Sequence, residues 1–522
     1  MGLPLRLEQK LEENFDEQLR TLRELVAIES VAADPQSEAA SPQAPFGEGV
    51  ERAYQYVLER GRTFGLEAFD ADHYGGHLQL SAGGSDGMES GGSESGAEGG
   101  SGTAGEADVT HAEGGSAARC DAGEADAPQT LGIVVHLDTV PVGSGWQHEP
   151  LAGEEEDGRL YGRGTADDKG PAVAALFAMK AIRDCGIVPR HNIRLILGLD
   201  EETDWVGMGR YREAAPAPDF GFTPDADFPV IQGEKGILVF DIARKFDRSE
   251  REGLQLRSIR GGSAPNMVAD YARAVVYAKK GHEIYEEIRS AAALQKEQGW
   301  LDIETKAAGR SLEIVVRGVS AHGAHPELGV NAITGLLRFL GRLPFAGDDV
   351  CDFLHFYNRH IGEETDGSSL GCGFSDARSG GTVVNVGGID LDPESVRLTV
   401  NVRYPITCTA EDVYAGMAEV CDRYNLGIIK GKDEAPIYLP AEDPLLTTLM
   451  DVYREHTGDT ASRPQIIGGG TYARAFEHVV AFGARFPGDE DMAHQKDEYI
   501  DLEKWRLLTK IYTDAIYRLA CV

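Results

Sequence analysis

Short apolar runs alternate with a helical pattern between residues 131 and 223, and this alternation constrains the fold most. The runs LGIVV (131–135), NIRLILGL (192–199) and PDFGF (218–222) have the length of buried strands. Between the first two runs, apolar residues after DDKGP step by three and four positions, as they do in a helix. Strand, helix and strand in series predict an α/β domain whose mainly parallel sheet has helices on both faces.

Polar residues stand where each of these strands ends. His136 and Asp138 follow the first strand, Glu201 and Glu202 follow the second, and Asp225 follows the third. An isolated His-x-Asp pair or acidic dipeptide is more often a solvated surface feature than a site, so each group alone is weak. Because ligands bind at the carboxyl ends of parallel strands, the shared placement favours one common site.

Two further groups have matching chemistry. Asp167 and Asp168 stand side by side before the predicted helix, and His494 lies in the segment MAHQKDEY near the C-terminus. Carboxylates gathered in one cleft raise each other's pKa unless cations neutralise them. Imidazole and carboxylate donors without thiolates suit zinc, manganese or cobalt.

Charge balance favours two divalent ions. If Asp167, Glu202 and Asp225 are the charged ligands, these three carboxylates and one hydroxide neutralise two divalent cations. His136 and His494 then complete one ion each, and Asp167 is shared between the ions. The adjacent aspartates are then no longer a simple repelling pair.

The pattern changes after about residue 234. Longer alternating runs such as GILVFDIARKF (236–246) and SVRLTVNVRYP (395–405) indicate strands, and a helix is expected over residues 266–299. After about residue 435 the pattern of the first part resumes. We therefore expect a metal-binding domain from residues 1–233 and 436–522, and an inserted α+β lid domain from residues 234–435.

Charge and composition exclude some classes of protein. Residues 84–130 are almost all Gly, Ser, Ala, Glu and Asp, with ten acidic residues and one arginine. This stretch has too little apolar surface to fold and is predicted to be a disordered surface loop, with weak cation or partner binding as the less favoured alternative. The net charge of −36 at pH 7 argues against nucleic acid or an anionic membrane as a partner.

Cysteine usage and the N-terminal segment favour a cytoplasmic protein. The seven cysteines are scattered and none forms a C-x-x-C pair, which fits reduced thiols. Residues 3–25 have the pattern of a charged amphipathic helix and not of a secretory signal, and no run of about 18 apolar residues could cross a membrane.

Seven segments in order resemble the motifs of the M20 metallopeptidases, most closely the PepV-type bacterial dipeptidases. They are HLDTVP, GRGTADDKGP, LGLDEE, TPDAD, GVSAHGAHPELGVNA, NVRYP and FPGDEDMAHQKDEY. The resemblance covers the chain apart from residues 84–130. It implies a dinuclear centre, usually zinc and sometimes manganese or cobalt, with His136, Asp167 and Asp225 on one ion and Asp167, Glu202 and His494 on the other. It also implies a cis bond between Asp167 and Asp168.

The resemblance also assigns roles around the metals. Asp138 would orient and polarise His136, as outer carboxylates do. Glu201 would be the general base that takes a proton from a water bridging the ions and passes it to the leaving amine. His322 would donate to the oxyanion, although it or nearby His325 could be an ordinary surface residue.

Three positions are candidate substrate contacts by the same resemblance. Arg403 matches an arginine that binds the substrate C-terminal carboxylate with a fork of hydrogen bonds, and a surface arginine on a strand is the alternative. Asn266 matches a substrate-contacting asparagine, with a helix cap as the alternative. Gly470 lies in GGGTYAR (468–474), a glycine-rich loop whose backbone could approach a peptide closely.

The predicted function is a dinuclear metallodipeptidase that cleaves short unblocked peptides. The inserted domain is long enough for two βαβ-type repeats that supply Asn266, His322 and Arg403 in one chain, so a monomer is expected. The alternative enzyme is an N-acyl amino acid deacylase, such as a desuccinylase or deacetylase, with the same centre. A binding protein on a retired enzyme scaffold is disfavoured because every ligand, the base and the oxyanion donor are present.

Overall fold

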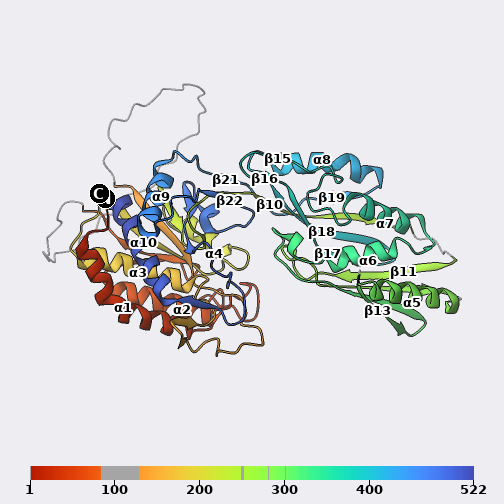
Figure 1. Cartoon of the computed structure of the whole chain (residues 1–522), viewed down its shortest axis with the longest axis horizontal. Helices are drawn as coiled ribbons and strands as arrows, with labels where there is room; N and C mark the ends of the chain where they lie inside the picture. The colour runs from red at the N-terminus through yellow and green to blue at the C-terminus, as the bar shows by residue number, and fades with distance from the viewer. Residues whose placement is uncertain (1, 84–127, 248–251, 280, 300) are drawn as a thin grey trace, which may run out of the picture.

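The structure is a computed structural model that describes residues 2–83, 128–247, 252–279, 281–299 and 301–522. Its strands form two large sheets, one in each of the two lobes seen in Figure 1. The strands of the first sheet come from residues 67–234 and 437–481, and those of the second from residues 236–434. The division of the chain into two folding domains at 233/234 and 435/436 stays a prediction.

The first lobe holds a mixed sheet with the strand order β1-β2-β6-β3-β7-β23-β9-β21, and β22 pairs with β9. Its strands are β1 (Glu67–Asp70), β2 (Gly76–Leu80), β3 (Thr130–His136), β6 (Asn192–Gly198), β7 (Phe220–Thr223), β9 (Ile231–Glu234), β21 (Ile437–Tyr438), β22 (Gln465–Ile467) and β23 (Val479–Ala481). Small strands are β4 (Glu154–Glu156), β5 (Arg159–Tyr161), β8 (Ala226–Asp227), β24 (Ala484–Arg485) and β25 (Tyr499–Asp501). The helices are α1 (Leu5–Val26), α2 (Glu48–Thr63), α3 (Lys169–Asp184), α4 (Val206–Ala214), α9 (Pro444–Thr457), α10 (Leu502–Ala520) and the 3₁₀ helix η2 (Tyr472–Ala475).

The centre of this sheet is parallel and covered on both faces. Strands β6, β3, β7 and β23 pair in parallel, while β1–β2, β2–β6, β23–β9 and β9–β21 pair antiparallel. Along β3, Ile133 and Val135 join the core under α1, α3 and α10, and Val134 joins the core with Tyr211 of α4 and Tyr472 of η2. The predicted α/β sheet flanked by helices is confirmed, and its parallel pairs are those of the central strands together with the pair β22–β9.

Parallel pairing brings the predicted polar residues to one edge. β3 ends at His136, β6 ends just before the acidic residues 200–202, and β7 ends two residues before Asp225. Because β3 lies between β6 and β7, all three carboxyl ends are neighbours.

The second lobe, called the lid below, holds the order β13-β14-β12-β11-β17-β18-β10-β19, with β20 paired to β10. Its strands are β10 (Gly236–Lys245), β11 (Leu254–Gly261), β12 (Tyr271–Ala278), β13 (Asp302–Ala308), β14 (Ser311–Arg317), β15 (Ser375–Asp376), β16 (Gly380–Gly381), β17 (Val383–Leu391), β18 (Ser395–Tyr404), β19 (Gly427–Ile429) and β20 (Asp433–Glu434). Its helices are α5 (His282–Glu297), the 3₁₀ helix η1 (Pro326–Leu328), α6 (Ala332–Leu340), α7 (Asp348–His360) and α8 (Ala410–Arg423).

Neighbouring strands of the lid sheet pair antiparallel. In β12–α5–β13, strand β14 lies between the two strands of the unit, and in β18–α8–β19, strand β10 does. Each unit therefore has parallel strands split by an antiparallel neighbour. The α+β lid is confirmed, while its composition of two βαβ-type repeats stays a prediction.

Two local expectations need correction. The predicted helix over 266–299 is wrong, because residues 271–278 form strand β12 and only His282–Glu297 are helical. In β12 the small and apolar residues Ala272, Ala274 and Val276 are buried while their neighbours face outward, which is the period of a strand. The predicted loop over 84–130 lies outside the described residues as far as residue 127, and Thr130 already begins β3.

Other expectations hold. Residues 5–26 form the amphipathic helix α1, which buries Leu7, Leu11 and Phe15. Cys185, Cys372, Cys408, Cys421 and Cys521 in the described ranges have free thiols. Among the helices of these ranges, none has the length and apolar character needed to span a membrane.

Candidate metal centre

His136 is held at the end of β3 by the segment that follows it. Its Nδ1 lies 3.0 Å from the carbonyl oxygen of Asp138 and 3.5 Å from the carboxylate Oδ1 of the same residue. This contact puts a proton on Nδ1 and leaves Nε2 to face the cleft. The Asp138 carboxylate also accepts the backbone N–H groups of Glu201 and Glu202, each at 3.1 Å, so it joins the ends of β3 and β6.

Asp167 lies between two imidazoles. Its Oδ1 is 2.9 Å from Nε2 of His136, and its Oδ2 is 3.1 Å from Nε2 of His494. The peptide bond between Asp167 and Asp168 is cis, as predicted. The two oxygens of one carboxylate therefore face two histidines that are 358 positions apart in the chain.

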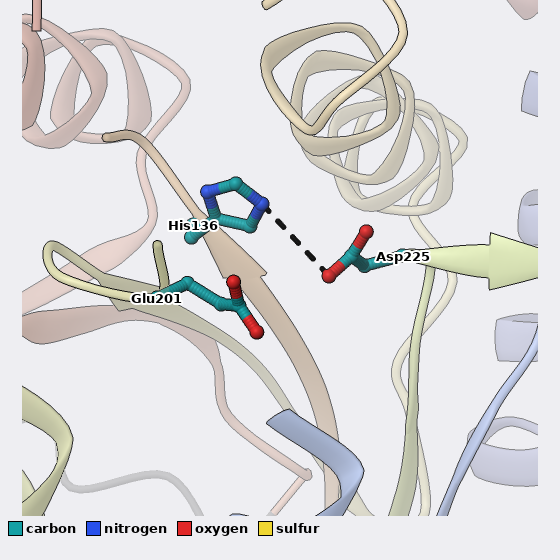
Figure 2. Close-up of side chains that lie close together, drawn as sticks. All are labelled: His136, Glu201 and Asp225. Atoms are coloured by element: carbon teal, nitrogen blue, oxygen red, sulfur yellow. Dashed lines mark ion pairs between the residues drawn. The ribbon is translucent and has the colours of Figure 1, made fainter. Parts of the chain in front are cut away.

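A further carboxylate stands beside each imidazole. Asp225 Oδ2 is 3.9 Å from Nε2 of His136, and Glu202 Oε1 is 2.9 Å from Nε2 of His494. Donor atoms of His136, Glu201 and Asp225 all lie within 4.8 Å of one another, and Figure 2 shows these three side chains converging from the end of β3 and from the segments that follow β6 and β7. Donor atoms of Asp167, Glu202 and His494 lie equally close together. The structure thus brings together all five predicted ligands and the predicted base.

The electrostatics of this cluster show an excess of buried negative charge. Burial, reinforced by the neighbouring Asp167, raises the pKa of Asp225 to about 7. Burial and Asp225 raise the pKa of Glu201 well above its usual range, and burial raises the pKa of Glu202. For Asp167 the hydrogen bonds to His136 and His494 outweigh burial, and its pKa is lowered.

These residues fit divalent cations. Buried carboxylates that repel one another are stabilised by a cation in their midst, and imidazole with carboxylate oxygen is a donor set for zinc, manganese or cobalt. Each group offers one imidazole nitrogen and two carboxylates, and Asp167 touches both imidazoles.

A cavity of about 730 Å³ connects this cluster to the lid. It is lined by Asp167 and Asp225 from the first lobe and by His322 and His325 from the lid, together with the loop that contains Gly470. Within a single chain, His322 and Gly470 therefore line the same cavity as Asp167 and Asp225.

His322 lines the cavity, and its hydrogen bonding selects the tautomer that has a free N–H donor. Its Nδ1 accepts the backbone N–H of Ala324 at 3.3 Å, so a neutral ring carries its proton on Nε2. The ring is reached by solvent, yet desolvation in the cavity and the nearby Arg403 lower its pKa to about 4. At neutral pH the ring is uncharged and can donate from Nε2.

Arg403 is a buried cation without an acidic partner. It is 3% exposed, and its guanidinium donates to Oδ1 of Asn401 at 3.0 Å and to the carbonyl of Gly468 at 3.1 Å. Within the described ranges no carboxylate lies within ion-pair distance of it. Burial and the neighbouring Arg474 lower its pKa to about 10. The alternative of a surface arginine on a strand is therefore wrong.

Asn266, like Arg403, is not among the residues that line the cavity. It is exposed in a turn, although its carbonyl accepts the N–H of Gly323 at 2.6 Å, next to His322. The alternative of a helix cap is wrong, because the segment after it leads into strand β12.

Residues not singled out from the sequence hold Asp167 and His494 in place. Buried Glu498 accepts the backbone N–H groups of Ala166 at 2.8 Å and Asp167 at 3.2 Å, and Nη1 of Arg163 at 2.6 Å. Arg163 in turn donates to the carbonyl of His494 at 3.3 Å. The glutamate is part of the segment MAHQKDEY, in which every other residue is exposed or only partly buried, so the sequence alone does not mark Glu498 as a buried residue.

Comparison with known proteins agrees with this architecture. The family model described as "Peptidase family M20/M25/M40" matches residues 132–518. A predicted dipeptidase of Staphylococcus epidermidis is 33% identical over 518 residues, which cover 98% of this chain and 99% of the relative, and one from Staphylococcus haemolyticus matches equally well.

Solved structures agree on the fold. Human carnosine dipeptidase 1 has a TM-score of 0.51 at 15% identity and covers 99% of this chain, with 98% of its own chain matched. The aminoacylhistidine dipeptidase of Vibrio alginolyticus has a TM-score of 0.52 at 12% identity, with 96% of each chain covered. With a family model that spans most of its length and near-full-length relatives above 30% identity, the chain belongs to peptidase family M20/M25/M40 and is a hydrolase of the metallopeptidase class.

Proposed function

We propose that the protein is a dinuclear metal-dependent dipeptidase that hydrolyses short unblocked peptides. The observation that carries the proposal is the position of Asp167, whose two oxygens face His136 at 2.9 Å and His494 at 3.1 Å. A further carboxylate that could serve as a ligand lies beside each histidine, Asp225 beside His136 and Glu202 beside His494. The dipeptidase names of the full-length relatives support the substrate class.

Two divalent ions would supply Lewis acidity and a water of lowered pKa. We propose zinc from the imidazole and carboxylate donors, with manganese or cobalt as substitutes. Glu201 is the proposed general base. Its carboxylate forms no hydrogen bond or ion pair with the described residues and lies with His136 and Asp225 at the cleft. It would hold the proton of the attacking water and deliver it to the leaving amine.

Asp138 is proposed to position both sides of this chemistry. Through its contact with Nδ1 it keeps the Nε2 lone pair of His136 directed into the cleft, and through its carboxylate it holds the backbone of Glu201 and Glu202.

The lid residues are proposed to bind the substrate. The Nε2–H of His322 would donate to the oxyanion that forms at the scissile carbonyl. The unpaired guanidinium of Arg403 would bind the C-terminal carboxylate of the peptide, and the loop at Gly470 would border the peptide backbone. Asn266 is proposed to act through its backbone contact with the His322 segment.

A monomer is proposed, because one chain supplies the metal-binding cluster and His322 to the same cavity. The free cysteines of the described ranges support a reducing compartment, and we propose the cytoplasm.

The test compares two substrate classes on one protein preparation. Protein stripped by a chelator is reloaded with zinc, manganese or cobalt, its metal content is measured, and it is offered free dipeptides and N-acyl amino acids in parallel. The proposal expects two ions per chain and turnover of the free dipeptides. Turnover of N-acyl amino acids alone would replace the dipeptidase with a deacylase, and two bound ions without turnover of either class would favour a binding protein.

A further inference from the structure

In the part of the chain that the structure describes, two crossings connect the lobes, and they lie side by side. The first passes from β9 to β10 through the single residue Lys235, and the second passes from β20 to β21 through residues 435 and 436. On the lid side Ile237 pairs with Glu434, and on the other side Glu234 pairs with Ile437. The crossings therefore form a narrow antiparallel ribbon between the sheets.

One arginine binds both crossings. Arg474, in η2 of the first lobe, donates through Nη2 to the carbonyl of Lys235 on the first crossing. Through Nη1 it donates to the carbonyl of Ala435 at 2.8 Å and to that of Glu434 at 3.2 Å on the second. The rigid fork of a guanidinium can reach two chain segments at once, which an ammonium cannot do in the same way.

A buried carboxylate fixes this arginine. Glu234 is fully buried, and its Oε2 lies 2.6 Å from Nε of Arg474. Its Oε1 accepts the hydroxyl of Thr471 at 2.7 Å. The contact at Nε is an ion pair without hydrogen-bond geometry, so the orientation of the guanidinium is fixed by this charge contact together with the hydrogen bonds of its two Nη groups.

The loop of residues 468–474, which contains Thr471 and Arg474, also contacts the lid at Arg403 and beside His322. The carbonyl of Gly468 accepts Arg403, and Gly468 faces Ala324, next to His322. A Cβ added at Gly470 would lie 2.8 Å from Cδ1 of Ile237 on β10 and 3.1 Å from Nε of Arg474, so a side chain there would have to displace one or both of them.

We propose that Arg474, oriented by Glu234, is a positioning residue that clamps the two crossings and thereby sets where Arg403 and His322 of the lid stand relative to the metal-binding cluster. The consequence for substrate binding rests on the proposed function, whereas the consequence for the crossings does not. Arg474 touches no reacting atom in this scheme and acts through the backbone it holds.

Amide hydrogen exchange tests the clamp without any activity. Arg474→Lys keeps the charge but loses the fork, and Arg474→Gln with Glu234→Gln removes the whole ion pair. In both, peptides over residues 231–240 and 430–440 should exchange about tenfold faster, while a peptide over residues 130–136 in β3 keeps its protection. Arg463→Gln is the matched control, since Arg463 is exposed in the same region and makes one weak bond of 3.5 Å to a backbone carbonyl.

The double variant separates a clamp from simple charge compensation. If Arg474 serves only to neutralise Glu234, removing both charges restores wild-type exchange at the crossings, and the proposal is overturned. Wild-type exchange in Arg474→Lys overturns it as well. These two variants carry the test if Arg474→Gln alone, which strands a buried carboxylate, does not fold.

A kinetic measurement then tests the consequence for the lid. In these variants the metal content should stay at the wild-type value, while KM for a free dipeptide rises about tenfold or more. The ratio of kcat/KM for the free dipeptide to kcat/KM for its C-terminal amide should fall. If exchange at the crossings rises and no dipeptide is cleaved even by the wild type, the clamp stands and the proposed function fails. If exchange rises and both KM and the preference are unchanged, the crossings are clamped without setting the lid, and the proposal fails in that part.

Discussion

Replacing Arg403 with methionine should separate substrate binding from protein stability. Methionine has a similar length and fills the buried space without a charge. Under the proposed function the guanidinium is the partner of the substrate carboxylate, so Arg403→Met should lose activity. Because the guanidinium has no acidic partner in the described part of the chain, the same change should leave the fold nearly as stable as before.

The structure sets the size of both effects. Removing one partner of a buried charged hydrogen-bonded pair costs about 2–5 kcal/mol, which is a loss of about 30-fold to several thousand-fold in kcat/KM. For stability, two hydrogen bonds are lost, to Asn401 and to Gly468, at about 1–3 kcal/mol each. Relief of a buried, unpaired cation offsets this by several kcal/mol, so the net change should stay within about 2 kcal/mol.

The assay compares a dipeptide with its C-terminal amide and follows urea unfolding in parallel. Wild type should prefer the free carboxylate, and Arg403→Met should cleave both substrates at a similar low rate. Arg397→Met on the same strand is the control, because that side chain is 61% exposed and pairs with Asp241 at the surface. An equal loss for both substrates, or a destabilisation above about 5 kcal/mol, would refute the reasoning.

Three further measurements probe the remaining chemistry. Glu201→Gln should keep both ions by elemental analysis and lower kcat about 10²- to 10⁴-fold, and near-normal turnover would remove Glu201 as the base. Glu498→Gln, which replaces the carboxylate that holds the loop of Asp167, should weaken metal binding about 10- to 100-fold in a competition titration with a chelating dye, and unchanged affinity would contradict that role. Buried His77 has a pKa lowered to about 3 by burial and Arg194, against about 6.5 when unfolded, so its contribution to stability is complete above pH 6.5 and is lost as pH falls toward 3. Between pH 7.5 and pH 5 wild type should therefore lose about 2 kcal/mol more than His77→Phe in urea unfolding, and parallel losses would contradict the assignment.

The sequence predicted the edge of the sheet where the metal-binding cluster lies, because that inference needs only local patterns. The strand that ends at His136 and the strand that ends before Glu201 can be recognised from the length of their apolar runs. Parallel pairing then places their ends together. His494 could be added because its residue type matches the missing ligand, even though its position beside Glu202 comes from pairing across the whole chain.

Other features could not be read from local patterns. Residues 271–278 mix alanine, valine and tyrosine in a way that suits a helix or a strand, and the antiparallel partners β11 and β14 decide for the strand. The bonds of Arg474 end on backbone carbonyls, which every residue has, so the sequence holds no sign of its partners. Glu498 reaches the loop of Asp167 across 331 positions, and only the folded chain brings the two together.

The arrangement of the proposed site also bears on how substrate length is selected. The metal-binding cluster is built on the first sheet, whereas Arg403 belongs to β18 and His322 to the segment that follows β14. A peptide whose carbonyl lies at the cluster and whose carboxylate reaches Arg403 must span the space between the lobes, so no single pocket residue sets its length. If the proposed clamp holds the lid, the crossings at Lys235 and at residues 435–436 set this spacing and would thereby limit the length of the peptide.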